Sequence, residues 1–597
     1  MRPSTFKTRS HAYWVFLCCT LAFQWACRDT HRNEAERPPN VIVILTDDQG
    51  WGDLGMNGNS KIRTPHIDAL AQQGAVVERF YVSPVCSPTR AEFLTGRYHV
   101  RSGVFSTSEG GERIDLDETT IAEHFKANGY ATAAFGKWHS GTQGPYHPNN
   151  RGFEEFYGFT SGHWGNYFSP MLDHNGEIVT GNGFLPDDLT DHALAFIESH
   201  KDAPFFVYVP YNTPHSPMQV PDQWWAGVQD ADLQTAHRYA QEEDLQFTKA
   251  AYALCENIDW NVGRIHQKVK SLGLSERTII VFLSDNGPNS HRFNGELKGK
   301  KGATDEGGVR VPFIINWQGT IPAATRVDRI AGAIDILPTL ADLATLPTPT
   351  EALDGMSLKP LLLNTAPDWD DRYLVTHWKN RVSLRDDRYL MAEDDRLYDL
   401  DEDPGQRTDV TAEQPEQWER MKAYKTQWMA EVLTELPKED LRSLPVGFGT
   451  LPTQLPARDA TPHGGIIRSN RWPNDSFLTA WTSLQDSITW EVEVLEPGTY
   501  EAVVYYTCAP QAIGSVLQLQ FGTQQLQATI TEAHDPPLIG HEQDRYPRQE
   551  SYVKAFQPMV LGNIDLKADT NSLSLKAVEK TYDTIMDFRL LTLRKLE

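Results

Sequence analysis

Short apolar runs alternate with amphipathic, helix-type stretches through the first half of the chain. Four runs are rich enough in β-branched and aromatic residues to predict buried strands: residues 41–46, 130–135, 205–210 and 278–284. Thr64-Pro65 indicates the start of a helix, and residues 335–344 predict another. This alternation is typical of a mostly parallel sheet covered by helices, so we expect an α/β domain over residues 38–345.

The second half of the chain changes character twice. Residues 346–436 predict a small α+β subdomain, and residues 437–465 are rich enough in proline and glycine to predict a linker. Beyond it, apolar residues recur at every second position, as in Ile488, Trp490 and Val492. This period of two is typical of antiparallel strands, so we expect a β-sandwich over residues 466–597.

The N-terminus has the pattern of an export signal over residues 1–27. Arg2, Lys7 and Arg9 precede an apolar run that ends at Ala26, which is short for a transmembrane helix. Simple cleavage and lipidation of Cys27 both fit this pattern. We therefore expect an exported protein, periplasmic, secreted or at the cell surface, that touches a membrane only through such a lipid anchor.

Cysteine usage and net charge narrow the function further. The body of the chain keeps only Cys86, Cys255 and Cys508, which are too few and too scattered for a disulfide framework. The formal net charge of −25 disfavours nucleic acid as a partner, because binding a polyphosphate requires a basic surface.

Polar side chains follow the four predicted strands, at the edge of a parallel sheet where ligands bind. The oxygen donors among them are Asp47, Asp48, Asp285 and Asn286. Such a set suits a hard cation such as calcium or magnesium rather than zinc. The other two strands are followed by Lys137, His139 and His215, whose charge suits a tetrahedral oxyanion. Singly, each residue is more often a turn or cap residue, so only their joint placement indicates a site.

One further motif is Cys86-Ser87-Pro88-Thr89-Arg90, followed by Leu94-Thr95-Gly96-Arg97. It resembles the signature of the type I sulfatase family, Cys-x-Pro-x-Arg with a downstream Thr-Gly-Arg. The resemblance extends over about residues 38–436. Its other motifs are Thr46-Asp47-Asp48-Gln49-Gly50, Gly136-Lys137-Trp138-His139, Ser284-Asp285-Asn286-Gly287 and Glu306-Gly307-Gly308.

The resemblance implies an alkaline-phosphatase-like sandwich and a set of site residues. A sulfatase-maturing enzyme would oxidise Cys86 to formylglycine (3-oxoalanine). One calcium ion would be bound by residue 86 together with Asp47, Asp48, Asp285 and Asn286. Arg90 and Lys137 would hold residue 86, and His139 would assist the release of sulfate. His215 and a lysine would bind sulfate and protonate the departing alcohol; alignment places this lysine at Lys301, with Lys300 adjacent.

The implied reaction is hydrolysis of a sulfate ester, in which the hydrated aldehyde attacks sulfur with assistance from calcium. We also expect a helix to begin near Pro88, so that its N-terminus favours an anion beside residue 86. Together with export and the appended sandwich, this chemistry suggests a sulfated carbohydrate as substrate. Trp472 and Trp481 either bind carbohydrate or pack the sandwich, and residues 163–167 either stack on a sugar or fill the core.

Two other functions fit the same residues. A related enzyme of this superfamily would hydrolyse phosphonate or phosphate esters. A non-catalytic glycan-binding surface protein would retain the body of a sulfatase without maturing Cys86, although the presence of every catalytic position disfavours this alternative.

Overall fold

The computed structural model describes residue 1 and residues 37–365, 369–437 and 440–596. Every described helix and strand belongs to one compact unit, Asn40–Glu597. Apart from Met1, the expected export signal and Cys27 lie outside the described residues. None of the described helices is both long and apolar enough to cross a membrane.

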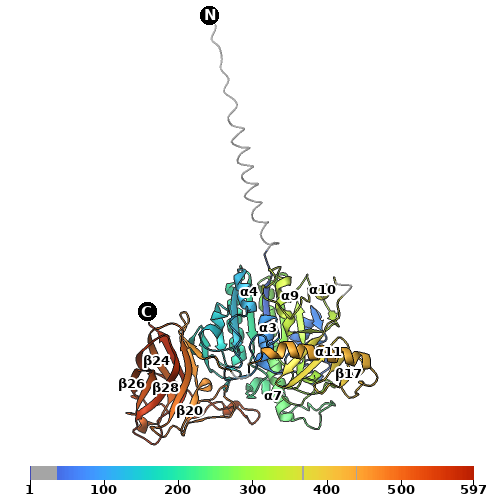
Figure 1. Cartoon of the computed structure of the whole chain (residues 1–597). Helices are drawn as coiled ribbons and strands as arrows, with labels where there is room; N and C mark the ends of the chain where they lie inside the picture. The colour runs from blue at the N-terminus through green and yellow to red at the C-terminus, as the bar shows by residue number, and fades with distance from the viewer. Residues whose placement is uncertain (2–36, 366–368, 438–439, 597) are drawn as a thin grey trace. The chain divides into compact units, whose positions relative to one another are not determined.

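A ten-stranded mixed sheet forms the centre of the first half of the chain (Figure 1). Its order is β12 (Thr325–Val327), β2 (Ala75–Val77), β11 (Phe313–Asn316), β9 (Thr278–Ser284), β1 (Asn40–Thr46), β8 (Phe205–Pro210), β4 (Ala131–Lys137), β5 (Glu155–Phe159), β6 (Met171–His174) and β7 (Glu177–Thr180). The five strands from β9 to β5 are parallel to one another, and they include all four predicted strands. The predicted α/β fold with a mostly parallel sheet is confirmed.

Helices cover both faces of this sheet, because successive side chains of its strands enter two different cores. On β1, Ile42 and Ile44 pack with α2 (Pro65–Gln72), α5 (Leu185–Ser199) and α7 (Leu245–Ser271). The alternate residues Val41, Val43 and Leu45 pack with α3 (Cys86–Thr95), α4 (Ile121–Ala127) and α9 (Ile336–Leu343). Burial on both faces explains why the central strands are continuous apolar runs.

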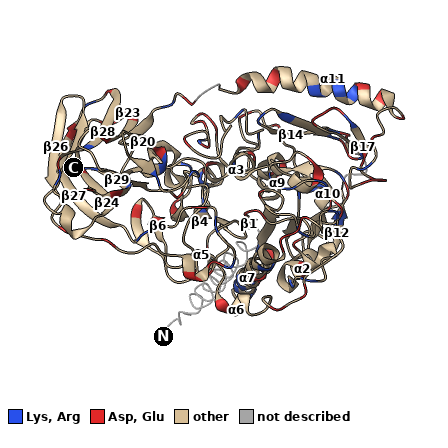
Figure 2. Cartoon of the chain, turned by 90° about the horizontal axis from the view of Figure 1, so that it is seen from below, with Lys and Arg blue, Asp and Glu red and all other residues tan. Residues whose placement is uncertain are grey.

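A smaller sheet follows, as the α+β pattern predicts. Its order is β14 (Leu374–Trp378), β15 (Arg381–Arg385), β16 (Tyr389–Met391) and β17 (Leu397–Asp399), and helix α11 (Pro415–Val432) packs against it. Residues of both charge signs lie along α11 (Figure 2). Arg385 of β15 forms a buried ion pair of 2.8 Å with Glu306 in the preceding part of the chain.

The C-terminal part is a sandwich of two sheets around one core, as predicted. The first sheet has the order β18-β23-β28-β25-β26, in which β25 is Val516–Phe521 and β26 is Gln524–Thr529. The second has the order β21-β22-β29-β24-β27, in which β21 is Ile467–Arg468 and β22 is Leu478–Thr479. Their longest strands are β23 (Ser487–Val494), β24 (Gly498–Thr507), β27 (Gln557–Leu566), β28 (Thr570–Glu579) and β29 (Asp587–Lys595). Along β23, buried and more exposed residues alternate, which is the observed counterpart of the period of two.

The prediction of a linker over residues 437–465 is wrong. Three short strands, β18 (Leu444–Val446), β19 (Thr453–Pro456) and β20 (Thr461–His463), pair with strands β23 and β29 of the sandwich. Each strand contains a proline, which sheets tolerate at edges and strand ends. Strands of three or four residues are too short to show a period, so composition alone suggested a linker.

The buried carboxylate of Asp475 joins the sandwich to the α/β half of the chain. It forms an ion pair with Arg589 of β29 and accepts a hydrogen bond from the backbone N–H of Gly165. We expect Asp475→Ala to lower the free energy of unfolding by about 3–5 kcal/mol, because Arg589 would remain buried without its partner. The measurement is urea denaturation followed by circular dichroism.

The control for this prediction is Glu177→Ala, which removes the exposed ion pair between Glu177 and Arg594. An exposed pair contributes only about 0–1 kcal/mol. Equal denaturation midpoints for the Asp475 variant and the control would contradict the role given to Asp475.

Candidate active site

The oxygen donors lie at the ends of two neighbouring parallel strands. Thr46 of β1 is in register with Ser284 of β9, so the residues that follow each strand meet. The backbone N–H of Asp48 donates to Asp285 Oδ1 at 3.2 Å, and Asn286 Nδ2 donates to Asp48 Oδ1 at 2.8 Å. The predicted group is therefore brought together by strand register.

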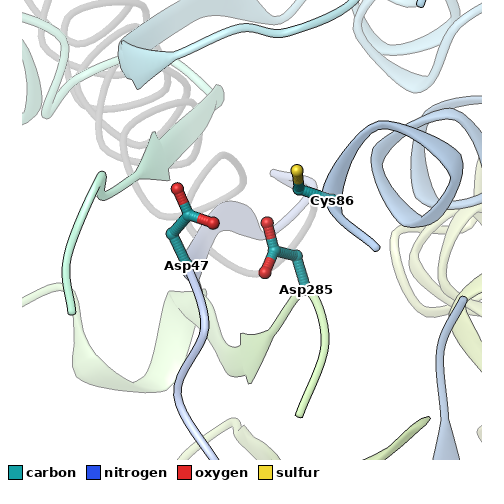
Figure 3. A group of neighbouring side chains, drawn as sticks. All are labelled: Asp47, Cys86 and Asp285. Atoms are coloured by element: carbon teal, nitrogen blue, oxygen red, sulfur yellow. The ribbon is translucent and has the colours of Figure 1, made fainter. Parts of the chain in front are cut away.

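Three oxygens of this group are buried and accept no hydrogen bond: Asp47 Oδ1, Asp48 Oδ2 and Asn286 Oδ1. Burying a polar atom without a partner is costly, so these atoms require a ligand. Possible metal-binding atoms of Asp47, Cys86 and Asp285 lie within 4.8 Å of one another, and their side chains converge in Figure 3. Apart from Cys86, the donors are oxygens, and the set fits a hard divalent cation.

Three cationic side chains from other parts of the chain surround these carboxylates. Lys137, the last residue of β4, donates to Asp47 Oδ2 at 2.8 Å, and Arg90 of α3 donates to Asp285 Oδ2 at 2.7 Å. Lys301 Nζ lies 2.6 Å from Asp48 Oδ1. The adjacent Lys300 lines the same cavity as Cys86 and Lys301. Among the described contacts, however, it forms no ion pair with the three carboxylates. The geometry therefore favours Lys301 over Lys300.

Burial and neighbouring charges determine the protonation of this cluster. Burial alone would raise the pKa of Asp47, but Lys137 and the other cations hold it well below its usual value. For Asp285, burial and the charge of Asp47 raise the pKa to about 7. Burial opposes the charge of Lys301, yet Asp48 and its neighbours raise the pKa of this lysine above its usual value. Lys301 therefore retains its proton.

Cys86 is the first residue of α3, and its side chain is buried. We predicted a helix that begins near Pro88, but it begins two residues earlier, because proline is tolerated within the first turn. Residue 86 thus belongs to the helix N-terminus, where the backbone favours an anion. Burial raises the pKa of the thiol, so the unmodified side chain is a poor nucleophile. Cys86, Cys255 and Cys508 are all free and buried.

Two histidines occupy the same pocket. His139 Nε2 donates to the carbonyl of Thr107 at 2.8 Å, and Nδ1 is buried without a partner. Burial and the charge of Lys137 hold the pKa of His139 well below its usual value, so the ring is neutral and Nδ1 is a free proton acceptor. His215 Nδ1 donates to the carbonyl of Ser216, and Nε2 lies 3.8 Å from Asp48 Oδ2.

The backbone at two of these residues has an unusual conformation. Asp48 has φ of 68° and His139 has φ of 58°, values in the left-handed region that few non-glycine residues adopt. Such conformations cost free energy and are found most often at functional sites. Here they lie at the second residue beyond β1 and beyond β4.

A third histidine, His163, was not among the predicted site residues. Its ring stacks on His215 with centroids 5.9 Å apart, and its buried Nε2 has no hydrogen-bond partner. Of the two interpretations of residues 163–167, core packing holds for Tyr167, which is buried, and for Trp164, which stacks on Phe159. His163 instead lines the pocket. Its position just beyond β5, next to β4, was the signal that sequence reasoning overlooked.

The fold and this site define a hydrolase of the alkaline-phosphatase-like type. The sulfatase family model matches residues 39–346, and the model described as N-sulphoglucosamine sulphohydrolase, C-terminal, matches residues 300–434. The chain belongs to the sulfatase family and is a sulfuric ester hydrolase. Neither model extends into the residues that form most of the sandwich.

Named relatives and solved structures agree with this assignment. N-acetylgalactosamine-6-sulfatase of Mus musculus is 32% identical over 366 residues, which are 55% of this chain and 67% of the relative. Arylsulfatase A of Homo sapiens is 34% identical over 369 residues, 55% of this chain and 68% of the relative. A crystal structure of Ps i-CgsB with k-i-k-neocarrahexaose is 30% identical with a TM-score of 0.60, and the match covers 66% of this chain and 93% of that one.

The unpartnered oxygens predict that calcium stabilises the folded chain. We expect saturating calcium to raise the melting temperature, since an ion at about 100 times its Kd adds roughly 2.7 kcal/mol. Asp47→Asn should remove most of this increase, because it replaces a charged ligand with a neutral one. The measurement is differential scanning calorimetry with calcium and with EDTA.

Asp583→Asn, at an exposed position in the sandwich, is the matched control and should keep the full increase. If both variants respond to calcium as the unchanged protein does, Asp47 is not a calcium ligand.

Proposed function

We propose that this chain removes sulfate from a sulfated carbohydrate, with Cys86 converted to formylglycine as the nucleophile. One observation carries the proposal: Cys86 lies at the start of α3, with its sulfur within 4.8 Å of carboxylate oxygens of Asp47 and Asp285. The protonated, buried thiol supports conversion, because it would react poorly as it stands. An aldehyde at this position hydrates to a diol, of which one hydroxyl can attack sulfur and the other can later expel sulfate.

Conversion of Cys86 must precede folding. All ten residues of α3, and with them the whole Cys86-Ser87-Pro88-Thr89-Arg90 motif, are buried in the folded chain. A maturing enzyme could not reach the cysteine once α3 has packed against the sheet. The proposed partner therefore acts on the unfolded chain, which fits a protein that folds after export.

Calcium would be held by Asp47, Asp48, Asp285 and Asn286. Bound there, it would polarise the nucleophile and an oxygen of the sulfate group. The three carboxylates of the site face three cations, Arg90, Lys137 and Lys301, so their formal charges sum to zero. A divalent cation would leave the site positive, which suits an anionic ester.

The remaining side chains divide the proton transfers between them. His139 presents an unpartnered Nδ1 and is neutral, so we assign it the proton from residue 86 when sulfate is expelled. His215 binds the Ser216 carbonyl through Nδ1, so a second proton would lie on Nε2, ready for the departing alcohol. Lys301 retains its proton and is better suited to binding a sulfate oxygen.

A carbohydrate is the proposed substrate for two reasons. The N-acetylgalactosamine-6-sulfatase relative and the complex with neocarrahexaose both bear the names of carbohydrates. The pocket beside Cys86 has a volume of about 870 Å³, near the upper end of ligand pockets at about 300–1,000 Å³. A sugar of more than one ring would fit this space.

The decisive assay compares sulfate, phosphate and phosphonate monoesters of 4-nitrophenol. We expect kcat/KM to be highest for the sulfate ester. Cys86→Ala and His215→Ala should lower it by at least about 1,000-fold, because they remove the nucleophile and a proton donor. Mass spectrometry of the tryptic peptide should show the aldehyde at residue 86.

Cys508→Ala is the matched control, since it also removes a buried thiol but lies in the sandwich. It should retain the activity of the unchanged chain. Turnover of a phosphorus ester alone would favour the phosphonate or phosphate hydrolase. An unmodified thiol at residue 86 in protein from the native host, with no turnover, would favour a glycan-binding protein.

A further inference from the structure

The C-terminal sandwich supplies part of the wall of the active-site pocket. The same cavity is lined by Cys86 and His215 and by two loops of the sandwich, residues 471–474 and 546–550. The first loop connects β21 (Ile467–Arg468) to β22 (Leu478–Thr479), and the second precedes β27. A ligand in this cavity can therefore contact both the residues around Cys86 and the sandwich.

The second loop is fixed to the chain around the catalytic histidines. Arg548 forms a buried ion pair with Asp544 of the same loop and donates to the carbonyl of Gly165 at 2.6 Å. Ser216, next to His215, donates a hydrogen bond to Glu550. These contacts fix the position of the loop relative to His215 and to the segment that follows β5.

The first loop is fixed equally closely. Asn474 Nδ2 donates to the carbonyl of Thr107, which also binds His139, and Ser161 Oγ donates to the carbonyl of Asn474. Asp475 adds the buried ion pair with Arg589. Both loops are thus bonded to the segments that follow α3, β5 and β8, and the sandwich is not an independently tethered module.

Within this wall, Trp472 stands out by its exposure. It is 46% exposed, whereas Trp481 and Trp490 of the same sandwich are 1% exposed and belong to its core. The Trp472 backbone N–H donates a hydrogen bond to Asn470 Oδ1 at 2.9 Å, and the Arg471 guanidinium lies 4.7 Å from the indole centroid. Arg471 therefore supports one face of the ring. An exposed, supported aromatic ring in a pocket is a platform for an apolar ligand face, such as the C–H face of a sugar.

We infer that the two sandwich loops form a subsite for the sugar next to the sulfated one, with Trp472 stacking on its ring. The inference rests on the proposed function and narrows it: the substrate is a sulfated oligosaccharide rather than a sulfated monosaccharide. The sandwich then acts in substrate selection at the active site itself. Of the two tryptophans considered from the sequence, Trp481 packs the core and Trp472 faces the ligand.

The test compares Trp472→Ala with the unchanged chain on three substrates. These are 4-nitrophenyl sulfate, a panel of sulfated oligosaccharides that includes neocarrahexaose, and the sulfated monosaccharide matching the best oligosaccharide. On that oligosaccharide we expect kcat/KM to fall roughly tenfold, equivalent to about 1.4 kcal/mol, mainly through KM. The loss on the other two substrates should be at least fivefold smaller. Trp472→Phe should recover most of the lost kcat/KM, because it keeps an aromatic face.

Trp260→Ala is the matched control, because Trp260 is similarly exposed at 38% and also lies beside an arginine, Arg264, but on helix α7 outside the pocket. It should behave as the unchanged chain on all three substrates. An unaltered kcat/KM of Trp472→Ala on the oligosaccharide, or an equal loss on all three substrates, would overturn the subsite. So would turnover of sulfated monosaccharides with none of oligosaccharides. Failure of the unchanged chain on every sulfate ester, 4-nitrophenyl sulfate included, would instead overturn the proposed function.

Discussion

Repulsion among three buried carboxylates is the constraint on which the rest of this site depends. Asp47, Asp48 and Asp285 are placed side by side by the register of β1 and β9, and burial together with the charge of Asp47 raises the pKa of Asp285. At about 4 Å, two like charges in a protein interior repel by roughly 4 kcal/mol at an effective dielectric of 20. The fold offsets this repulsion with cations delivered from α3, from the end of β4 and from the segment before α8 (Glu306–Val309).

The same arrangement leaves buried oxygens that are available to bind a metal ion. Ion pairing satisfies some of the carboxylate oxygens, while others remain buried and without hydrogen bonds. A divalent cation would be coordinated by these oxygens and would change the net charge of the cluster from zero to positive. Charge balance, rather than any single residue, therefore links the packing of the sheet to recognition of an anionic ester.

Much of this site could be predicted from the sequence, because apolar strands followed by polar residues determine which side chains meet at the sheet edge. Asp47 and Asp285 follow strands that are buried on both faces. Such strands are continuous apolar runs, which can be recognised in the sequence. His163 was missed because β5 (Glu155–Phe159) is short and contains a glycine, and so gave no clear strand pattern. The strands of the expected linker were missed because they are only three or four residues long.

Other features depend on contacts between distant segments, which no local pattern encodes. Trp472 and Trp481 lie nine positions apart in the sequence, and the packing of the sandwich separates the buried ring from the exposed one. The position of the sandwich loops beside His215 likewise depends on hydrogen bonds between residues more than 300 positions apart. Composition indicated a separate module, but these contacts make it part of the pocket.

The most direct test of the central claim is a crystal structure of the matured chain grown with calcium. The account predicts one calcium ion within about 2.3–2.6 Å of oxygens from Asp47, Asp48, Asp285 and Asn286, next to residue 86. Absence of an ion among these residues at saturating calcium, or an ion bound only elsewhere, would contradict it.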